Sequence, residues 1–143
     1  MFKFSALLSL VVAYASAVTL PLAGRQSGAC AREYTVAPGD ACNKISAAQN
    51  VSTFQLAWTN PTAIDQWCSN LRPEQVLCLG KEGKDCTDVH VVEAGDGCWA
   101  IYTGAGIPAE TFFANNPNVA RTCHNIYPGE VLCVASEVFD YST

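Results

Sequence analysis

The sequence CAREYTVAPGDAC at residues 30–42 recurs in similar form as CTDVHVVEAGDGC at residues 86–98. Each copy starts and ends on a cysteine and carries a Gly-Asp pair near its end. The separations between cysteines repeat as well: 12, 26 and 10 residues from Cys30 to Cys78, then 12, 25 and 10 from Cys86 to Cys133. This pattern predicts a tandem duplication of a unit of about fifty residues.

Other residues follow the same duplication. At an offset of 56, Val36 matches Val92, and Asn60-Pro61 matches Asn116-Pro117. After one deletion, placed opposite residues 62–67, the offset is 55. The duplication divides the chain into a first unit (30–80), a linker (81–85) and a second unit (86–135). We expect a signal peptide (1–17) and a flexible leader (18–29) before them, and a C-terminal tail (136–143) after them.

The first half of each unit predicts a strand followed by a short helix. Tyr34-Thr35-Val36 alternates like a half-buried strand, and Gly39-Asp40 turns the chain, with Asp40 as the expected N-cap of the helix. The helix is expected to bury one apolar face. That face consists of Cys42, Ile45 and Ala48 in the first unit, and of Cys98, Ile101 and Ala105 in the second.

The second half predicts another helix and a closing strand. Ser52 and Gln55 form a capping-box pattern, Phe54 and Trp58 are expected on the buried face, and Pro61 ends the helix. In the second unit Pro108 is expected in the first turn of the helix. The closing strands are Val76-Leu77-Cys78-Leu79 and Val131-Leu132-Cys133-Val134. Each unit is thus predicted to be α+β, with two helices covering one face of a two-stranded antiparallel sheet.

The first residues predict secretion. Lys3 is followed by an apolar run over residues 4–15, which ends in the small-residue motif Ala15-Ser16-Ala17. The run is shorter than the ~20 residues that span a bilayer, so a cleaved signal is favoured over a membrane anchor. In the leader, Arg25 is either a second processing site or an ordinary solvated residue.

Charge and cysteine content exclude several classes of protein. The formal net charge is −5, or −6 once Lys3 leaves with the signal, and the basic residues are scattered. Neither nucleic acid nor a membrane surface is therefore expected as a partner. Eight cysteines in the secreted part indicate four disulfides, two in each unit, although the spacing leaves three pairings open per unit. No CxxC pair occurs and only two histidines are present, so no metal or other cofactor is expected.

The linker allows both units to act together. The seven residues from Leu79 to Asp85 include two glycines, which predicts a coil with a reach of roughly 15 Å. Two sites joined in this way could bind one long ligand with avidity.

The order Tyr34-Thr35-Val36, Gly39-Asp40, Asn60-Pro61 and Pro73 resembles a LysM domain, and His90 to Val134 resembles a second one. With its four cysteines per unit, the chain is similar to fungal secreted LysM effectors. The resemblance implies a shallow groove between two loops that binds chitin or peptidoglycan. The implied carbohydrate-binding residues are Pro38, Gly39, Asp40, Ala41, Asn60, Pro61, Thr62, Ala63 and Ile64 in the first unit, and Ala94, Gly95, Asp96, Gly97, Asn116, Pro117, Asn118 and Val119 in the second.

Two substitutions between the units favour the second as the tighter site. The first unit has Glu74 where the second has Gly129, and Asn43 where the second has Trp99. Trp99 is either a residue that stacks on a sugar or a cover for the disulfide at Cys98. Asn50, in the sequon Asn50-Val51-Ser52, is a candidate glycosylation site.

Catalysis is not expected. Asp40 and Asp96 could suggest the acid and base of a glycosidase, but each recurs once per unit in a glycine turn, without a second recurring carboxylate. In the alignment of the two units, Asp65 is expected at the position equivalent to Arg121. His90 and His124 occupy unrelated positions and are interpreted as structural.

The sequence therefore predicts a secreted, extracellular, non-catalytic binder of chitin or its oligosaccharides. Such a protein would coat the producer's wall or remove fragments that a host detects, and could associate through its ligand or as a homo-oligomer. The alternatives are a disulfide-rich protein-interaction module such as a protease inhibitor, a small hydrolase, or a LysM protein directed at peptidoglycan.

Overall fold

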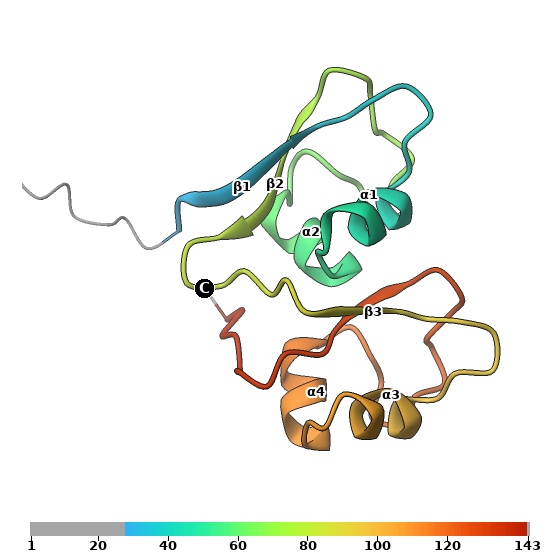
Figure 1. Cartoon of the computed structure of the whole chain (residues 1–143). Coiled ribbons are helices and arrows are strands. Elements are labelled where there is room, and N and C mark those ends of the chain that lie inside the picture. Colours follow the sequence, from blue (N-terminus) through green and yellow to red (C-terminus); the bar gives the residue numbers. More distant parts are fainter. Residues whose placement is uncertain (1–27, 143) are drawn as a thin grey trace, which may run out of the picture.

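The computed structural model describes residues 28–142 and confirms an α+β fold built twice. The predicted signal peptide, Arg25 and most of the predicted leader lie outside the described residues. The order strand, helix, helix, strand occurs in both units, here called unit one (30–80) and unit two (86–135) (Figure 1). No helix within residues 28–142 has the length and apolarity needed to cross a membrane.

In unit one, β1 (Cys30–Thr35) pairs with β2 (Val76–Lys81), and the helices are α1 (Cys42–Gln49) and α2 (Thr53–Thr59). The strands are antiparallel, with Tyr34 opposite Leu77. The first loop, 36–41, joins β1 to α1, and the second loop, 60–75, joins α2 to β2.

Unit two repeats this arrangement with shorter strands. β3 (Val89–Val91) pairs antiparallel with β4 (Val131–Cys133), and the helices are α3 (Cys98–Gly104) and α4 (Ala109–Asn115). Its first loop is 92–97 and its second loop is 116–130.

Each unit has its own small hydrophobic core between its helices and its sheet. Apolar side chains from both helices meet the inward side chains of the strands, which explains the periodicity in the sequence. The core of unit one includes Val36, Ile45, Val51, Leu56, Ile64, Leu77 and Leu79. That of unit two includes Val92, Ile101, Ile107, Phe112, Val119, Leu132 and Val134.

The predicted N-cap role of Asp40 is wrong. The N-cap of α1 is Ala41, which makes no side-chain cap bond. Asp40 Oδ2 instead accepts hydrogen bonds from the Tyr34 hydroxyl and the Ala37 N–H, both at 2.8 Å. Asp40 lies one residue before the cap, so its carboxylate reaches the amide of its own turn more easily than the amides of the helix.

The other predicted helix starts are partly correct. Ser52 is the N-cap of α2, and its hydroxyl accepts from the Gln55 N–H at 3.0 Å. The Gln55 side chain does not return to Ser52, however, because its amide donates to the carbonyl of Leu79 at 2.8 Å. Pro108 is the N-cap of α4 and precedes its first turn.

The predicted buried faces of the first helices are also only partly correct. Ile45 and Ile101 are buried as expected, but Ala48 is exposed, and Ala105 is exposed beyond the end of α3. Ser46 is buried in place of Ala48. Because these helices have only eight and seven residues, one turn of each contacts the core.

The four disulfides all form within a unit, as the duplication favoured. Cys30 pairs with Cys78 and Cys86 with Cys133, and each of these bonds joins the first strand region of a unit to its last strand. Cys42 pairs with Cys68 and Cys98 with Cys123, and these join the start of a helix to the second loop. Every cysteine of the chain is paired.

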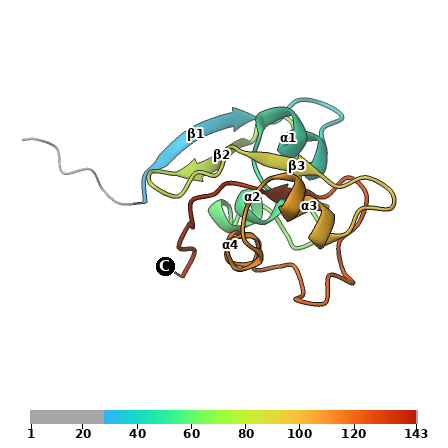
Figure 2. The same cartoon turned by 60° about the horizontal axis from the view of Figure 1, so that its bottom comes forward.

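The two units stack on one another. Sheet and helices alternate along the stack, so the sheet of unit two lies against the helices of unit one (Figures 1 and 2). The Val131 N–H on β4 donates to Thr53 Oγ1 on α2 at 2.9 Å. One face of α1 and α2 therefore packs in the core of unit one, and another face contacts unit two.

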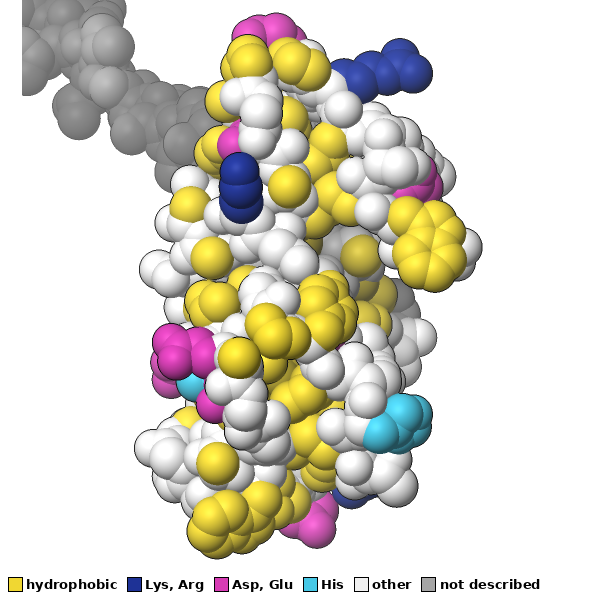
Figure 3. Space-filling model, turned by 90° about the vertical axis from the view of Figure 1, so that its right-hand side faces the viewer, with side chains coloured by type: hydrophobic (Ala, Val, Ile, Leu, Met, Phe, Trp, Pro, Cys, Tyr) yellow, Lys and Arg dark blue, Asp and Glu magenta, His cyan; other side chains and the backbone are white. Residues whose placement is uncertain are grey.

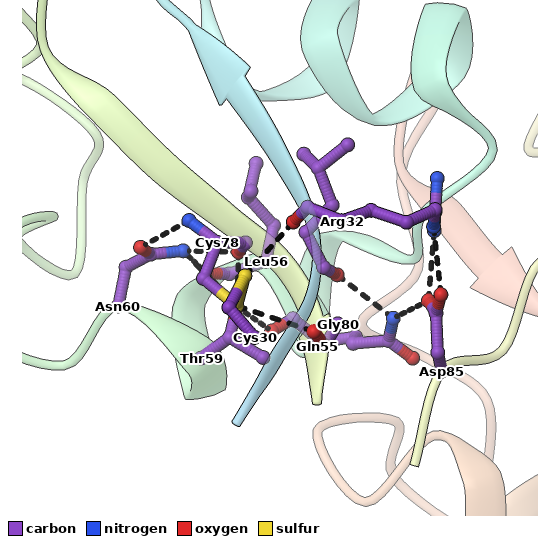
Figure 4. The surroundings of a disulfide bond; sticks show 10 residues. Cys30, Arg32, Gln55, Leu56, Thr59, Asn60, Cys78, Gly80 and Asp85 are labelled. Carbon is purple, nitrogen blue, oxygen red and sulfur yellow. Dashed lines mark hydrogen bonds and ion pairs between the residues drawn. A yellow bond between two sulfur atoms is a disulfide. The ribbon is translucent and has the colours of Figure 1, made fainter. Parts of the chain in front are cut away.

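The connection between the units is ordered, which corrects the predicted coil. Residues 81 and 84 form a β-bridge, and Asp85 accepts hydrogen bonds from Arg32 at 2.7 and 2.8 Å and from the Gln55 amide at 2.9 Å (Figure 4). A Cβ added at Gly80 would overlap the Asp85 side chain. These contacts fix the linker on unit one, so its random-coil reach does not set the spacing of the units.

The C-terminal tail also joins the units. Tyr141 packs edge-on against Phe54 and Trp58, with ring centroids 5.2 and 5.1 Å apart. Phe54 and Trp58 thus share a face of α2, as predicted, but the tail covers that face. Leu56 occupies the core side of the helix instead.

Candidate functional site

The first loop has the same tight turn in both units. In unit two, Asp96 Oδ2 lies 2.9 Å from the Glu93 N and 2.8 Å from His90 Nε2, as Asp40 does with Ala37 and Tyr34. Gly39 and Gly95 have φ angles of 85° and 92°, a left-handed conformation that favours glycine. The sequence pattern therefore encodes a rigid turn with exposed backbone at its tip.

The carboxylates of both turns accept hydrogen bonds from the backbone. The Glu93 N–H, followed by His90, holds the pKa of Asp96 below its ordinary value. In unit one the hydrogen bond to Asp40 raises the pKa of the Tyr34 hydroxyl. A general acid of a glycosidase needs a raised carboxyl pKa, so this environment does not favour that role for Asp96.

The second loop is anchored by a buried asparagine in each unit. Asn60 donates to the Cys78 carbonyl at 2.7 Å and accepts from the Cys78 N–H at 2.9 Å (Figure 4). Asn116 makes the same pair of bonds to Cys133, both at 2.8 Å. Because these side chains are buried and satisfied, they hold the start of the loop against the sheet and do not face solvent.

A second asparagine folds the rest of the loop. Asn70 Oδ1 accepts from the Asp65 N–H at 2.9 Å, and Asn125 Oδ1 accepts from the Ala120 N–H at 2.8 Å. Asp65 therefore corresponds to Ala120 and not to Arg121, which corrects the predicted alignment. The single-residue difference between the units falls at the beginning of the second loop, close to Thr62.

A disulfide brings the two loops of each unit together. Cys42 begins α1 directly after the first loop, and its bond to Cys68 holds the second loop beside it. The Cys42 N–H also lies 3.2 Å from Cys68 Sγ. Cys98 and Cys123 repeat this arrangement in unit two, with the corresponding N–H at 3.0 Å.

The predicted binding residues divide into buried and exposed groups. Ile64 and Val119 are core residues, like the two anchoring asparagines, and can support a groove only from below. The half-buried members are Asp40, Ala63, Asp96 and Gly97. The exposed members are Pro38, Gly39, Ala41, Pro61 and Thr62 in unit one, and Ala94, Gly95, Pro117 and Asn118 in unit two.

The second loop of unit one borders a hollow of about 440 Å³. Thr62 and Ala63 line one side, and the turn before β2 lines the other with Pro73, Glu74 and Gln75. Gln75 spans the two sides, since its amide donates to the Ala63 carbonyl at 2.9 Å. The volume of this hollow is within the range of small-ligand sites.

Unit two has a buried carboxylate where unit one has this glutamine. Glu130 is 3% exposed, and its Oε1 accepts from the Asn118 amide at 2.8 Å. Its other oxygen, Oε2, is buried without a hydrogen-bond partner. Burial raises the pKa of Glu130. Asn118, a predicted site residue, is therefore held by an acidic group that the sequence analysis did not identify.

Large exposed aromatic side chains occur in or directly next to the loops of both units, and these loops lie on the same face of the molecule (Figure 1). Trp99 is 71% exposed and Trp67 is 80% exposed. Figure 3 shows hydrophobic side chains along this face in both units. Trp99 was predicted as a candidate from the sequence, whereas Trp67 was not. Trp67 also differs between the units, because unit two has Thr122 at the equivalent position.

Within residues 28–142, no three histidine, cysteine or carboxylate side chains are grouped so that they could bind a metal ion. Asn50 is exposed at the end of α1 with a left-handed φ of 49°. Its glycosylation stays a prediction.

The family model for the LysM domain matches residues 34–80 and 90–135. The secreted LysM effector ldpA of Aspergillus fumigatus is 28% identical over 135 residues, covering 73% of this chain and 35% of its own. The secreted LysM effector LysM1 of Trichophyton rubrum is 28% identical over 128 residues, covering 73% and 50%. The non-secreted LysM effector LCP1 of Gibberella moniliformis is 32% identical over 114 residues, covering 78% and 15%.

The chain thus spans half or less of the length of each of these relatives. Among solved structures, the spore cortex-lytic enzyme SleL of Bacillus megaterium has 19% identity and a TM-score of 0.33, over 71% of this chain and 21% of its own. That likeness is too weak to support an argument about function.

Proposed function

The chain belongs to the LysM domain family, and on that premise we propose that it is a secreted, non-catalytic protein that binds chitin or related N-acetylglucosamine polymers outside the cell. The relatives named above are fungal LysM effectors, two of them secreted and one non-secreted. Secretion of this chain is favoured by its predicted signal and by its four disulfides, which need an oxidising compartment.

The observation that carries the proposal is the pair of loops that a disulfide holds together in each domain. The exposed tips of these loops are built from glycine, proline and other small residues, so backbone N–H and C=O groups are accessible to a ligand. An added Cβ at Gly39 or Gly95 would have no neighbour within 4 Å. Such a surface suits the acetamido and hydroxyl groups of a neutral sugar.

The proposed site in each domain consists of the exposed members of the predicted binding residues: Pro38, Gly39, Ala41, Pro61 and Thr62 in unit one, and Ala94, Gly95, Pro117 and Asn118 in unit two. Asn60, Ile64, Asn116 and Val119 act as its buried support and not as direct contacts. Asp40 and Asp96 hold the turn of the first loop through their hydrogen bonds within the protein. A ligand could use only the carboxylate lone pairs that these bonds leave free.

We expect unit two to bind more tightly than unit one. Trp99 follows Cys98 in the first turn of α3, directly after the first loop, and is 71% exposed. In unit one the corresponding residue is Asn43, which accepts a hydrogen bond from Thr53 at 3.3 Å. A flat indole provides apolar area for a sugar ring that a short amide does not.

Two domains that bind the same polymer give the protein its proposed biological role. It coats chitin in the producer's wall or removes chitin fragments that a host would detect. Ligand-bridged association of several copies is expected on long chains.

Calorimetric titration of the mature, oxidised protein with chitin hexamer tests the proposal, with cellohexaose and soluble peptidoglycan fragments as parallel ligands. Saturable binding of chitin hexamer, with none of cellohexaose, is the expected result. Binding of the peptidoglycan fragments alone would show that the protein is specific for peptidoglycan and not for chitin. Absence of heat with all three would refute carbohydrate binding and favour a protein-interaction module.

A further inference from the structure

A second hollow, of about 480 Å³, lies where the two units meet. It is formed partly by residues next to the loops of unit one and partly by unit two. Ala41, Asn43, Thr53, Gln66 and Trp67 line it from unit one, together with the Cys42–Cys68 disulfide, and Tyr127 lines it from unit two.

Two exposed aromatic side chains from different units border this hollow. Trp67 is 80% exposed and Tyr127 is 45% exposed, so both offer ring surface to a ligand. Apolar rings left in water within one concave region are typical of a binding site.

The backbone holds both aromatic residues in place. The N–H of Trp67 donates to Asp65 Oδ1 at 3.1 Å, and the next residue is the disulfide-bonded Cys68. The carbonyl of Tyr127 accepts from the Glu130 N–H at 3.0 Å in the turn before β4. A ligand would therefore bind to rings whose attachment points are already ordered.

The duplication of the fold does not account for this pair. Unit two has Thr122 at the position of Trp67, and unit one has Arg72 at the position of Tyr127. Asn43 also lines the hollow, and unit two has Trp99 at the equivalent position. Residues in which the units differ thus meet at one place, where the stacking of the units brings Tyr127 to Asn43 and Trp67 of unit one.

The residues that line the hollow carry no formal charge. The chain as a whole has a net charge of −5. Charged side chains in Figure 3 lie mainly toward the edges of the face. Amide and hydroxyl groups with two aromatic rings match a neutral polyhydroxylated ligand better than a charged peptide or nucleic acid.

We propose that this hollow is a carbohydrate subsite that continues the groove of unit one and lets a single N-acetylglucosamine chain contact both units. The inference rests on the proposed function, because it assumes the same class of ligand. Ala41 belongs to the first loop and Trp67 to the second, so the hollow borders both loops that form the proposed groove of unit one. Tyr127 then extends the contact across the boundary between the units.

The test compares chitin hexamer with chitin trimer in calorimetric titrations of the full mature chain. Trp67→Thr introduces the residue type that unit two has at the equivalent position, Thr122. Tyr127→Ala removes the other aromatic ring. Each variant is expected to bind hexamer about tenfold more weakly, as loss of an aromatic binding residue does, while trimer binding in the loop grooves is retained. Val76→Ala, which trims a 56% exposed side chain on β2 outside the hollow, serves as the control and should bind like the wild type.

The outcomes separate this inference from the proposed function. If the wild type binds hexamer and both variants match it, the subsite is refuted and the proposed function stands. If the wild type binds neither oligomer, the proposed function fails and the subsite fails with it. If the variants bind hexamer normally but lose binding of an aromatic-rich peptide, the hollow is a peptide site. Thermal denaturation of each variant confirms that the fold is intact.

Discussion

The hydroxyl of Tyr141 donates a 3.0 Å hydrogen bond to Gln55 Oε1, across a separation of 86 residues. The same Oε1 accepts from the Cys86 N–H at 2.9 Å. The Gln55 amide nitrogen reaches the Leu79 carbonyl and Asp85. One buried side chain on α2 thus connects the closing strand of unit one, the linker, the start of unit two and the C-terminal tail.

Tyr141→Phe should weaken this connection. Loss of the hydrogen bond is expected to lower the free energy of unfolding by about 1 kcal/mol. Burial, followed by the charge of Asp85, raises the pKa of Tyr141 from 10.0 to about 12. A phenol whose pKa is higher in the folded state stabilises it fully below pH 10.0 and loses that contribution as the pH rises toward 12.

Denaturant unfolding across the alkaline range measures this effect. The wild type should lose stability above pH 10.0 more steeply than Tyr141→Phe. Val76→Ala, which trims an exposed side chain on β2 and removes no titrating group, is the control and should keep the wild-type slope. Parallel slopes for the wild type and Tyr141→Phe would contradict the role of this phenol.

Gly80→Ala should destabilise the protein because the new methyl group would overlap the Asp85 side chain. Displacing Asp85 would also disturb its hydrogen bonds to Arg32 and Gln55. We expect a loss of about 1 to 3 kcal/mol, as for other overpacked sites. Gly104→Ala, at the end of α3 with open space around its Cβ, should be neutral or slightly stabilising, and thermal melting of both variants gives the comparison.

Glu130→Gln should stabilise unit two at neutral pH. The pKa of Glu130 is raised by burial, so its contribution to stability is greatest below its ordinary pKa of 4.5 and falls as the pH rises through the raised value. Unit one has a glutamine, Gln75, at the position equivalent to Glu130. A gain of about 1 kcal/mol at neutral pH is expected from removing a buried oxygen without a partner.

Chemical denaturation of Glu130→Gln and wild type at neutral pH and below pH 4.5 tests this sign. The advantage of the variant should shrink in acid, where the wild-type carboxyl is protonated. A variant that is equally stabilised at both pH values would show that burial of the charge is not the cause.

Trp99→Ala distinguishes stacking on a sugar from protection of a disulfide. If the exposed indole stacks on ligand, chitin affinity of unit two falls about tenfold and the unfolding midpoint does not move. If the indole only covers the Cys98–Cys123 bond, stability falls and affinity does not. Titration calorimetry and thermal melting of the same sample decide between the two.

Replacing Cys98 and Cys123 together by alanine should separate the two loops of unit two. Removal of one such crosslink is expected to cost about 2 to 4 kcal/mol. Chitin affinity should fall as well, because the second loop would lose its attachment at the start of α3. The matched variant without Cys42 and Cys68 tests unit one, and unchanged affinity in both would mean that the disulfides do not organise the site.

Local patterns in the sequence predicted the elements of this fold correctly. The repeated cysteine spacing identified the duplication, and short-range signals such as Ser52 and Pro61 placed the start and end of α2. These predictions depend on interactions within a few residues, or on a comparison of one unit with the other. Both kinds of information are present along the chain before it folds.

Predictions that depended on the direction of a polar side chain were less successful. Asp40 was expected to cap α1 and Gln55 to return to Ser52, but both bind groups made available by tertiary packing. Asn60 and Asn116 were expected at the sugar and are buried against the closing strands. A side-chain amide or carboxylate has several partners within reach, and the sequence does not rank them.

The composition, the duplication, the order of strands and helices and the confinement of disulfides to each unit could all be inferred from the residues alone. The pairing of cysteines, the stacking of the sheet of unit two on the helices of unit one, and the meeting of Trp67 and Tyr127 required the folded chain. These features join residues that are far apart in sequence, and they form only when both small cores are packed and the linker is held at Asp85.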